Sequence, residues 1–135
     1  MPGYSGTPLP RKLGLKEQFR IALFEVPADV ELELREELAK CQRSRERLDF
    51  AMIFVKSRAA LEKQFSRFAK KLAHTGMLWV SWPKKSSGVA TDLSENVVRD
   101  IGLEAGLVDV KVCAVTDVWS GLKFVIRVKD RKEMI

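Results

Sequence analysis

Residues that build catalytic and metal sites are scarce in this sequence. Its 135 residues include one His and two Cys, and neither Cys41 nor Cys113 has a second Cys or a His at metal-ligand spacing. A Ser-His-Asp triad would have to use His74, which we place in the last turn of a helix that leads away from the carboxyl ends of the strands. We therefore predict no metal site, no cofactor and no catalytic residue, and the sequence leans against an enzyme.

Long hydrophobic runs are absent as well. No apolar stretch approaches the ~20 residues that a membrane span requires, and residues 1–14 contain no hydrophobic block of signal-peptide length. The two cysteines fit small apolar residues of a reducing compartment better than a disulfide. We expect a cytoplasmic protein that makes no membrane contact.

The charge balance is basic. The chain has 24 Lys and Arg against 18 Asp and Glu, a net charge of +6 that favours anionic partners through long-range attraction. The basic residues are spread along the chain instead of forming one arm, a pattern typical of a solvated surface. Weak, charge-driven binding of nucleic acid is a further alternative.

Three nearly continuous apolar runs predict strands that are buried on both faces, as in a parallel sheet. They cover residues 19–26, 48–55 and 77–82. Helical spacing of apolar residues follows each run, with Asp29, Ser57 and Ser94 as predicted N-caps and with Gly76 and Gly106 ending the second and third helices.

The last part of the chain has a different pattern. Apolar and polar residues alternate over 108–115 and again over 122–128, which predicts a β-hairpin with its turn near Ser120–Gly121. The element order is therefore β-α-β-α-β-α-β-β. Right-handed crossovers make the first three strands parallel, with helices on both faces of the sheet and an antiparallel hairpin at its edge. We predict an extended N-terminal arm over residues 1–14 and a single Rossmann-like, three-layer α/β domain over residues 15–135.

Ligands of open α/β sheets bind beyond the carboxyl ends of the parallel strands. The segment after the third predicted strand is the most distinctive one there. It combines an aromatic ring, two ammonium groups and hydroxyls with a flexible Gly, ahead of a helix N-terminus that attracts anions. We predict an anion-binding rim made of Trp82, Lys84, Lys85, Ser86, Ser87, Gly88 and Thr91. Further candidate contributors are Tyr4, Ser5, Thr7, Glu25 and Trp119.

A plainer interpretation of this segment stays open. It treats Lys84 and Lys85 as a solvated turn, Ser94 as a helix cap and Trp82 as a core residue. The phosphate-loop pattern GxxxxGK[ST] is absent, because the lysines precede the glycine. The partner of the predicted rim would be a phosphate- or carboxylate-bearing small molecule, or a protein.

The sequence also resembles two known families. The stretch from Leu48 to Val128, with HTGMLWVSWP, LEAGLVDVKV and LKFVIRV, resembles the C-terminal half of a class I methyltransferase that uses S-adenosylmethionine. The motifs GYSGTPL, KLGLK, WPKKSSGVATDL and GLVDVKVCAVTDVWSGLKFV resemble, over the whole chain, a bacterial family built on a domain of unknown function. The second resemblance is the more specific one, and it implies a Rossmann-like fold without an activity.

The sequence departs from the methyltransferase pattern where the cofactor would bind. Such enzymes place a glycine-rich turn after the first strand and a carboxylate at the end of the next. Here the turn over residues 23–29 has no glycine, and the next predicted strand ends at Lys56. The main interpretation is therefore a non-catalytic binding or interaction module with an anion-binding rim. The alternative is a degenerate or small methyltransferase-like enzyme.

Overall fold

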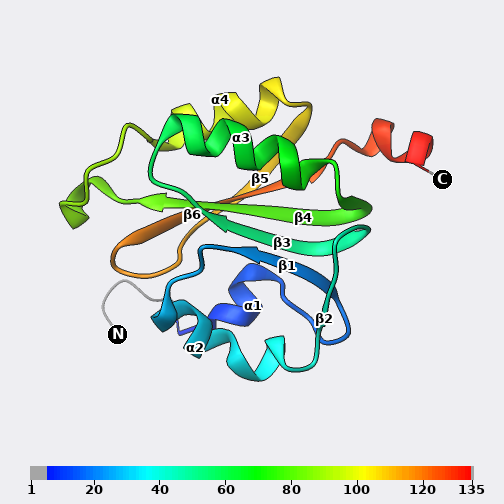
Figure 1. Ribbon diagram of the computed structural model, residues 1–135, viewed down its shortest axis with the longest axis horizontal. Coiled ribbons are helices and arrows are strands. Elements are labelled where there is room, and N and C mark those ends of the chain that lie inside the picture. The colour runs from blue at the N-terminus through cyan, green and yellow to red at the C-terminus, as the bar shows by residue number, and fades with distance from the viewer. Residues whose placement is uncertain (1–5, 135) are drawn as a thin grey trace.

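The computed structural model describes residues 6–134, with side chains described up to residue 131, and it is built around one six-stranded sheet (Figure 1). The strand order across the sheet is β2-β1-β3-β4-β6-β5. The strands β1 to β4 run parallel, while β6 is antiparallel to β4 and β5 is antiparallel to β6. Their bounds are Arg20–Phe24 for β1, Gln42–Arg43 for β2, Leu48–Phe54 for β3, Leu72–Pro83 for β4, Leu107–Ala114 for β5 and Trp119–Ile126 for β6.

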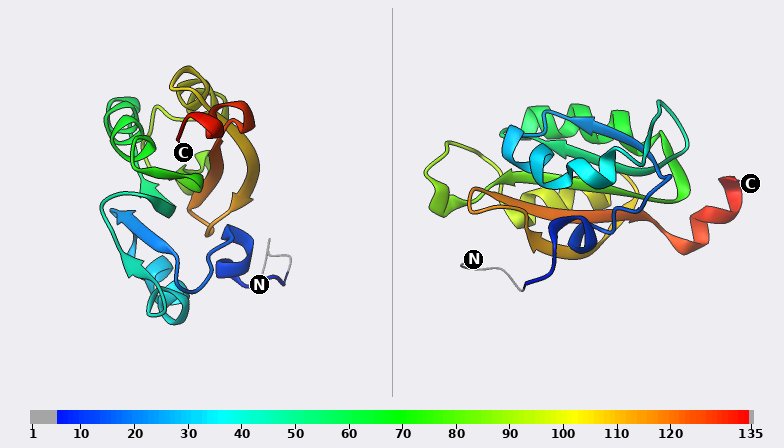
Figure 2. Two further views of the ribbon diagram at one scale, coloured as in Figure 1. Left: turned by 90° about the vertical axis from the view of Figure 1, so that its right-hand side faces the viewer. Right: turned by 90° about the horizontal axis from the view of Figure 1, so that it is seen from below.

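Helices cover both faces of this sheet. The left-hand view of Figure 2 shows one helix pair above the sheet and another pair below it. The lower pair is α1 (Leu9–Leu13) and α2 (Ala28–Leu38), and the upper pair is α3 (Arg58–Ala69) and α4 (Glu95–Glu104). Two short 3₁₀ helices, η1 (Lys85–Ser87) and η2 (Val128–Met134), follow β4 and β6. The predicted three-layer Rossmann-like α/β fold with a C-terminal antiparallel hairpin is confirmed.

The core lies in two apolar layers, one on each face of the sheet. Alternate residues of β3 enter opposite layers, so Ile53 packs under α3 and α4 while Phe54 packs against α1 and α2. All residues of β3 except Asp49 are buried, as the continuous apolar run predicts. Trp79 extends from β4 into the lower layer, where its indole N–H donates to the Leu13 carbonyl oxygen at 2.8 Å. This bond ties the N-terminal segment to the sheet.

The predicted N-terminal arm is wrong in one part. Residues 9–13 form helix α1 instead of an extended segment, and Gly14 ends this helix with a left-handed φ of 77°. Leu9 and Leu13 are buried because α1 covers the face of the sheet around Trp79. These leucines hold the segment against the domain, whereas Tyr4 and Ser5 lie outside the described residues.

Several predicted boundaries are also wrong. Helix α3 ends at Ala69, not at Gly76, and His74 and Gly76 belong to an irregular start of β4. Gly76 is needed there because a Cβ would clash with the Leu48 carbonyl oxygen. The hairpin turn covers residues 115–118, and Ser120–Gly121 lie within β6.

The start of α2 and the connection that follows it differ from the prediction too. Pro27, not Asp29, occupies the N-cap of α2, and the Asp29 carboxylate accepts from the Val30 N–H. After α2 the chain forms the short strand β2, which the sequence did not predict and which pairs with the start of β1. The N-caps Ser57 and Ser94 are confirmed, because each hydroxyl accepts a backbone N–H of the first turn. Within the described residues, no helix has the length and apolar character needed to cross a membrane.

Candidate functional site

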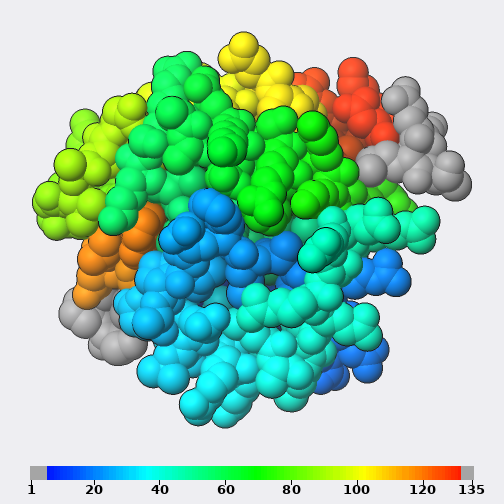
Figure 3. Space-filling model, in the orientation of Figure 1, coloured from blue at the N-terminus to red at the C-terminus, as the bar shows by residue number. Residues whose placement is uncertain are grey.

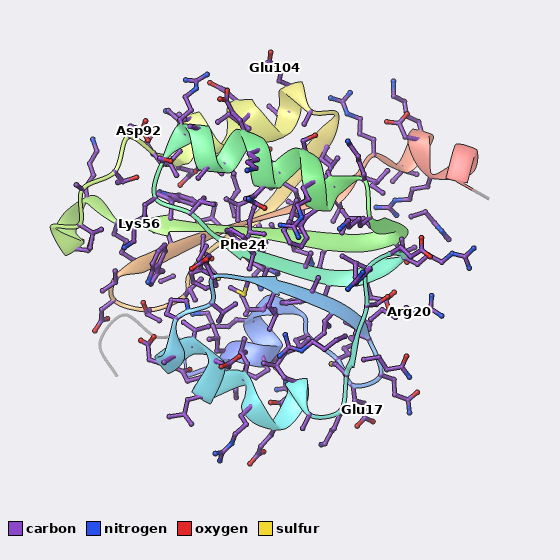
Figure 4. The ribbon with its side chains drawn as sticks, in the orientation of Figure 1. Glu17, Arg20, Phe24, Lys56, Asp92 and Glu104 are labelled. Atoms are coloured by element: carbon purple, nitrogen blue, oxygen red, sulfur yellow. The ribbon has the colours of Figure 1, made fainter. Side chains whose placement is uncertain are left out.

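The carboxyl ends of β1, β3 and β4 meet at one edge of the sheet, which we call the carboxyl edge. Figure 4 shows Lys56 and Asp92 at this edge, on the side opposite Arg20. Hydrogen bonds tie the converging loops together. The Lys84 N–H donates to the Val118 carbonyl at 2.7 Å, and the Thr91 hydroxyl donates to the Lys56 carbonyl at 2.6 Å. The predicted convergence of the loops after the strands is therefore present, and the β5–β6 turn joins it.

Three residues of the predicted anion-binding rim contact other parts of the protein through their side chains. Trp82 is 4% exposed and packs in the upper core layer, in agreement with the plainer interpretation of this residue. The Ser87 hydroxyl donates to the Lys84 carbonyl at 2.6 Å and accepts from the Val89 N–H. The Thr91 hydroxyl also accepts from the Leu93 N–H. These groups hold the loop in shape.

The remaining members of the predicted rim lie on the surface of the loop. Lys85 and Ser86 are exposed on η1, and Gly88 ends it with a left-handed φ of 77°. Lys84 is half-buried, and its charge acts on Cys113, whose surroundings are described below. Whether an anion binds these residues stays a prediction.

The turn after β1 is the place where a methyl-donor site would be built. Glu25 has a left-handed φ of 56°, a conformation that favours glycine, and Val26 and Pro27 follow it. No glycine is present to let the backbone approach a cofactor. The short strand β2 ends at Arg43, opposite Ile21 near the start of β1, so it brings no carboxylate to the carboxyl edge.

Two aromatic side chains meet at the carboxyl edge, on the face of the sheet that α1 and α2 cover. The rings of Phe54 and Trp119 meet edge to face with their centroids 5.0 Å apart. The two rings meet over β4 near Ser81. In the sheet, Ser81 pairs with Phe54 of β3 on one side and with Gly121 of β6 on the other. The Ser81 hydroxyl is fully buried and has no hydrogen-bond partner among the described residues. The turn after β1 therefore does not fit S-adenosylmethionine, because Glu25, Val26 and Pro27 stand where a glycine-rich turn would let the backbone approach the cofactor.

A group of lysines lies beside the same edge, on the face that α1 covers. Burial raises the pKa of the Cys113 thiol, and the charges of Lys12, Lys111 and Lys84 oppose that shift. The Lys12 ammonium donates to the Ala114 carbonyl at 3.1 Å. Sequence reasoning missed this cluster, since Lys12 and Lys111 are 99 residues apart and no local pattern links them.

A small pocket adjoins this lysine cluster. It has a volume of about 190 Å³ and lies between the N-terminal segment, α2 and the β5–β6 turn. Its lining includes Thr7, Leu9, Lys12, Glu33 and Val115. Of the predicted rim contributors, Thr7 lines this pocket, Trp119 packs against Phe54 and Glu25 is exposed in the turn after β1. The pocket can hold a small apolar group beside one cation and one carboxylate.

Metal and nucleophile chemistry find little support in the part of the chain that the structure describes. It contains no group of three or more His, Cys, Asp or Glu residues that could hold a metal ion. His74 lies at the start of β4, at the edge opposite the loops described above, so a triad at the carboxyl edge cannot use it. The raised pKa values of Cys41 and Cys113 disfavour their thiolate forms.

Comparisons with known proteins identify the fold. No family model and no curated protein matches this chain. Among solved structures, it is similar to a methyltransferase from Aquifex aeolicus that depends on S-adenosylmethionine, at 14% identity over 87% of both chains with a TM-score of 0.59. It is also similar to magnesium protoporphyrin IX methyltransferase from Synechocystis, at 11% identity over 88% of this chain and 74% of that one with a TM-score of 0.57.

A third similar structure is a methyltransferase from Corynebacterium glutamicum, at 7% identity over 93% of this chain and 90% of that one, with a TM-score of 0.54. At such low identity these likenesses concern the fold alone. The chain has the Rossmann-like fold of the methyltransferases that depend on S-adenosylmethionine.

Proposed function

We propose that this protein is a degenerate methyltransferase, one that keeps the scaffold of the fold and has lost the site for the methyl donor. The observation that carries the proposal is the turn after β1, which has no glycine over residues 23–29, where the backbone would approach the methyl donor. The left-handed backbone at Glu25 supports it further, since the turn keeps a conformation suited to glycine without having the glycine. A protein of this kind acts by binding and does not transfer a methyl group.

Binding of S-adenosylhomocysteine tests the proposal. A ligand at 1 mM with a Kd of 10 μM would stabilise the native state by about 2.7 kcal/mol. For a domain of this length, that free energy corresponds to a rise in Tm of about 10 °C. We expect no rise in Tm and no heat of binding in calorimetry with either S-adenosylhomocysteine or S-adenosylmethionine. A saturable response to either compound would refute the proposal and support a small active methyltransferase.

A second candidate function is the binding of an anionic small molecule, and the lysine cluster around Cys113 favours it. The group made of Lys12, Lys84 and Lys111 brings positive charge beside the pocket of about 190 Å³. Burial and the neighbouring Lys111 charge lower the pKa of Lys123 on the same face, which indicates crowded positive charge there. A phosphate or carboxylate group would relieve this repulsion.

Single substitutions separate this cluster from the exposed rim. The charge of half-buried Lys84 acts on the pKa of the Cys113 thiol, whereas Lys85 lies exposed on η1. We expect Lys84→Ala to weaken the binding of inorganic pyrophosphate, followed by NMR chemical shifts, and Lys85→Ala to leave it unchanged. Equal loss in both variants would favour the rim predicted from the sequence, and no pyrophosphate binding at millimolar concentration would exclude both sites.

A further inference from the structure

The chain's excess of positive charge gathers at the edge opposite the candidate site. We call this the basic edge and define it by the segments 15–20, 39–49, 70–76 and 127–131, which adjoin the amino ends of β1 to β4 and the carboxyl end of β6. These segments carry eleven Lys and Arg and four Asp and Glu. The basic residues are Lys16, Arg20, Lys40, Arg43, Arg45, Arg47, Lys70, Lys71, Arg127, Lys129 and Arg131.

The carboxyl edge has no such excess. Its connecting segments 25–27, 55–57, 84–94 and 115–118 carry three Lys and three Asp or Glu. Glu37 and Glu104, in the last turns of α2 and α4, border the basic edge and leave its balance positive. The interpretation of dispersed basic residues holds along the sequence, but folding brings many of them to one side of the molecule.

The exposed arginines of the basic edge form no ion pair with a described side chain. The ion pairs between described side chains join Arg58 to Glu62 and Arg99 to Glu95 and Asp109, all outside the basic edge. Arg20, Arg43, Arg45 and Arg47 are exposed. Arg47 holds a left-handed φ of 53°, a conformation that few residues other than glycine adopt. Ion pairing within the described part of the chain therefore does not neutralise this edge.

A groove lies at the basic edge. It has a volume of about 570 Å³ and lies between the starts of β1, β3 and β4, where Arg20, Arg47 and His74 line it together with Asp49. The Asp49 carboxylate accepts the backbone N–H of Arg20 at 2.9 Å. Figures 3 and 4 show this side of the molecule at the right, where the β2–β3 connection lies next to the α3–β4 connection and Arg20 points outward. The Leu48 N–H donates a hydrogen bond to the Lys71 carbonyl oxygen at 2.8 Å, which joins those two connections.

We propose that the basic edge binds the phosphate backbone of duplex nucleic acid without reading its sequence. Five neighbouring strands of the sheet, in the order β2-β1-β3-β4-β6, each have one end at this edge. At the usual spacing between strands, the edge extends about 19 Å. That length matches about six base pairs of a duplex. Guanidinium groups suit phosphate because they donate in a planar fork. Phe19 and Phe68, which lie beside the edge, are not exposed, so neither ring is available for base stacking.

The proposal is tested with a fluorescein-labelled 20-base-pair duplex and fluorescence anisotropy at 50, 100 and 200 mM NaCl. With about four phosphates neutralised, the plot of log K against log salt should have a slope of about −3.6. The variant Arg43→Gln, Arg45→Gln, Arg47→Gln removes three exposed charges that form no ion pair with a described side chain. It should flatten the slope by about 2 to 3 and weaken binding at 50 mM by more than about tenfold.

A matched control removes three charges elsewhere. Lys56→Gln, Lys63→Gln, Lys85→Gln lowers the net charge equally, and these exposed residues lie outside the basic edge. We expect this control to keep the slope of the unmodified protein, and thermal unfolding of both variants checks that each is folded. Equal weakening in both variants, a flat response to salt, or binding to phosphatidylserine vesicles with none to the duplex would overturn the proposal.

Discussion

Two buried hydroxyls at the carboxyl edge give opposite predictions for stability. Ser81 is fully buried, and its hydroxyl has no hydrogen-bond partner within the described part of the chain. Thr116 is 8% exposed, and its hydroxyl accepts the N–H groups of Val118 and Trp119, each at 3.1 Å. Because a buried polar group is unfavourable only when it is unpaired, replacing these two hydroxyls should change the free energy of unfolding in opposite directions.

The magnitudes follow from the same difference. An unpaired buried hydroxyl costs about 1 to 3 kcal/mol, and the void left by one missing oxygen costs about 0.3 kcal/mol. Ser81→Ala should therefore raise the free energy of unfolding by about 1 kcal/mol, a rise in Tm of about 3 to 5 °C. Thr116→Val leaves two turn N–H groups without an acceptor and should lower the free energy of unfolding by about 2 kcal/mol.

Urea unfolding followed by circular dichroism measures both changes, with an unchanged m-value as the sign that the unfolded states are comparable. If Ser81→Ala lowered the free energy of unfolding by more than about 0.5 kcal/mol, the hydroxyl would have to be paired. The description of Ser81 as a buried, unpaired hydroxyl would then be wrong. A stabilising Thr116→Val would refute the assigned turn bonds.

Three further predictions concern other parts of the molecule. Gly102→Ala should lower the free energy of unfolding by about 1 to 3 kcal/mol in urea, despite the better helix propensity of Ala, because its Cβ would clash with the Phe124 ring. Labelling of Cys113 by a maleimide should be slow at pH 7.5 and accelerate only above the pH expected for an ordinary thiol, since burial raises the pKa of this thiol and its reactive thiolate forms later. Arg99→Met should cost less than about 1 kcal/mol in thermal unfolding, because its ion pairs with Glu95 and Asp109 are partly exposed.

The sequence by itself determined the class of fold. Continuous apolar runs predict buried parallel strands because both faces of such strands are covered, and β3 is buried in this way. Ser57 and Ser94 predict helix starts because their hydroxyls replace the missing acceptors of the first turn. The missing glycine after β1 was likewise readable from residues 23–29, since the requirement for it is local. These features depend on neighbours within a few positions of the chain.

Only the tertiary structure decided where the charges and the irregular segments lie. Helix α1 forms because Leu9 and Leu13 have the lower core layer to pack on, and Gly76 is required by the carbonyl of Leu48, which is distant in sequence. The cluster of Lys12, Lys84 and Lys111 and the basic edge join segments that no periodicity connects. Parallel strands bring all their amino ends to one side of the sheet, so basic residues scattered along the chain become one surface only after folding.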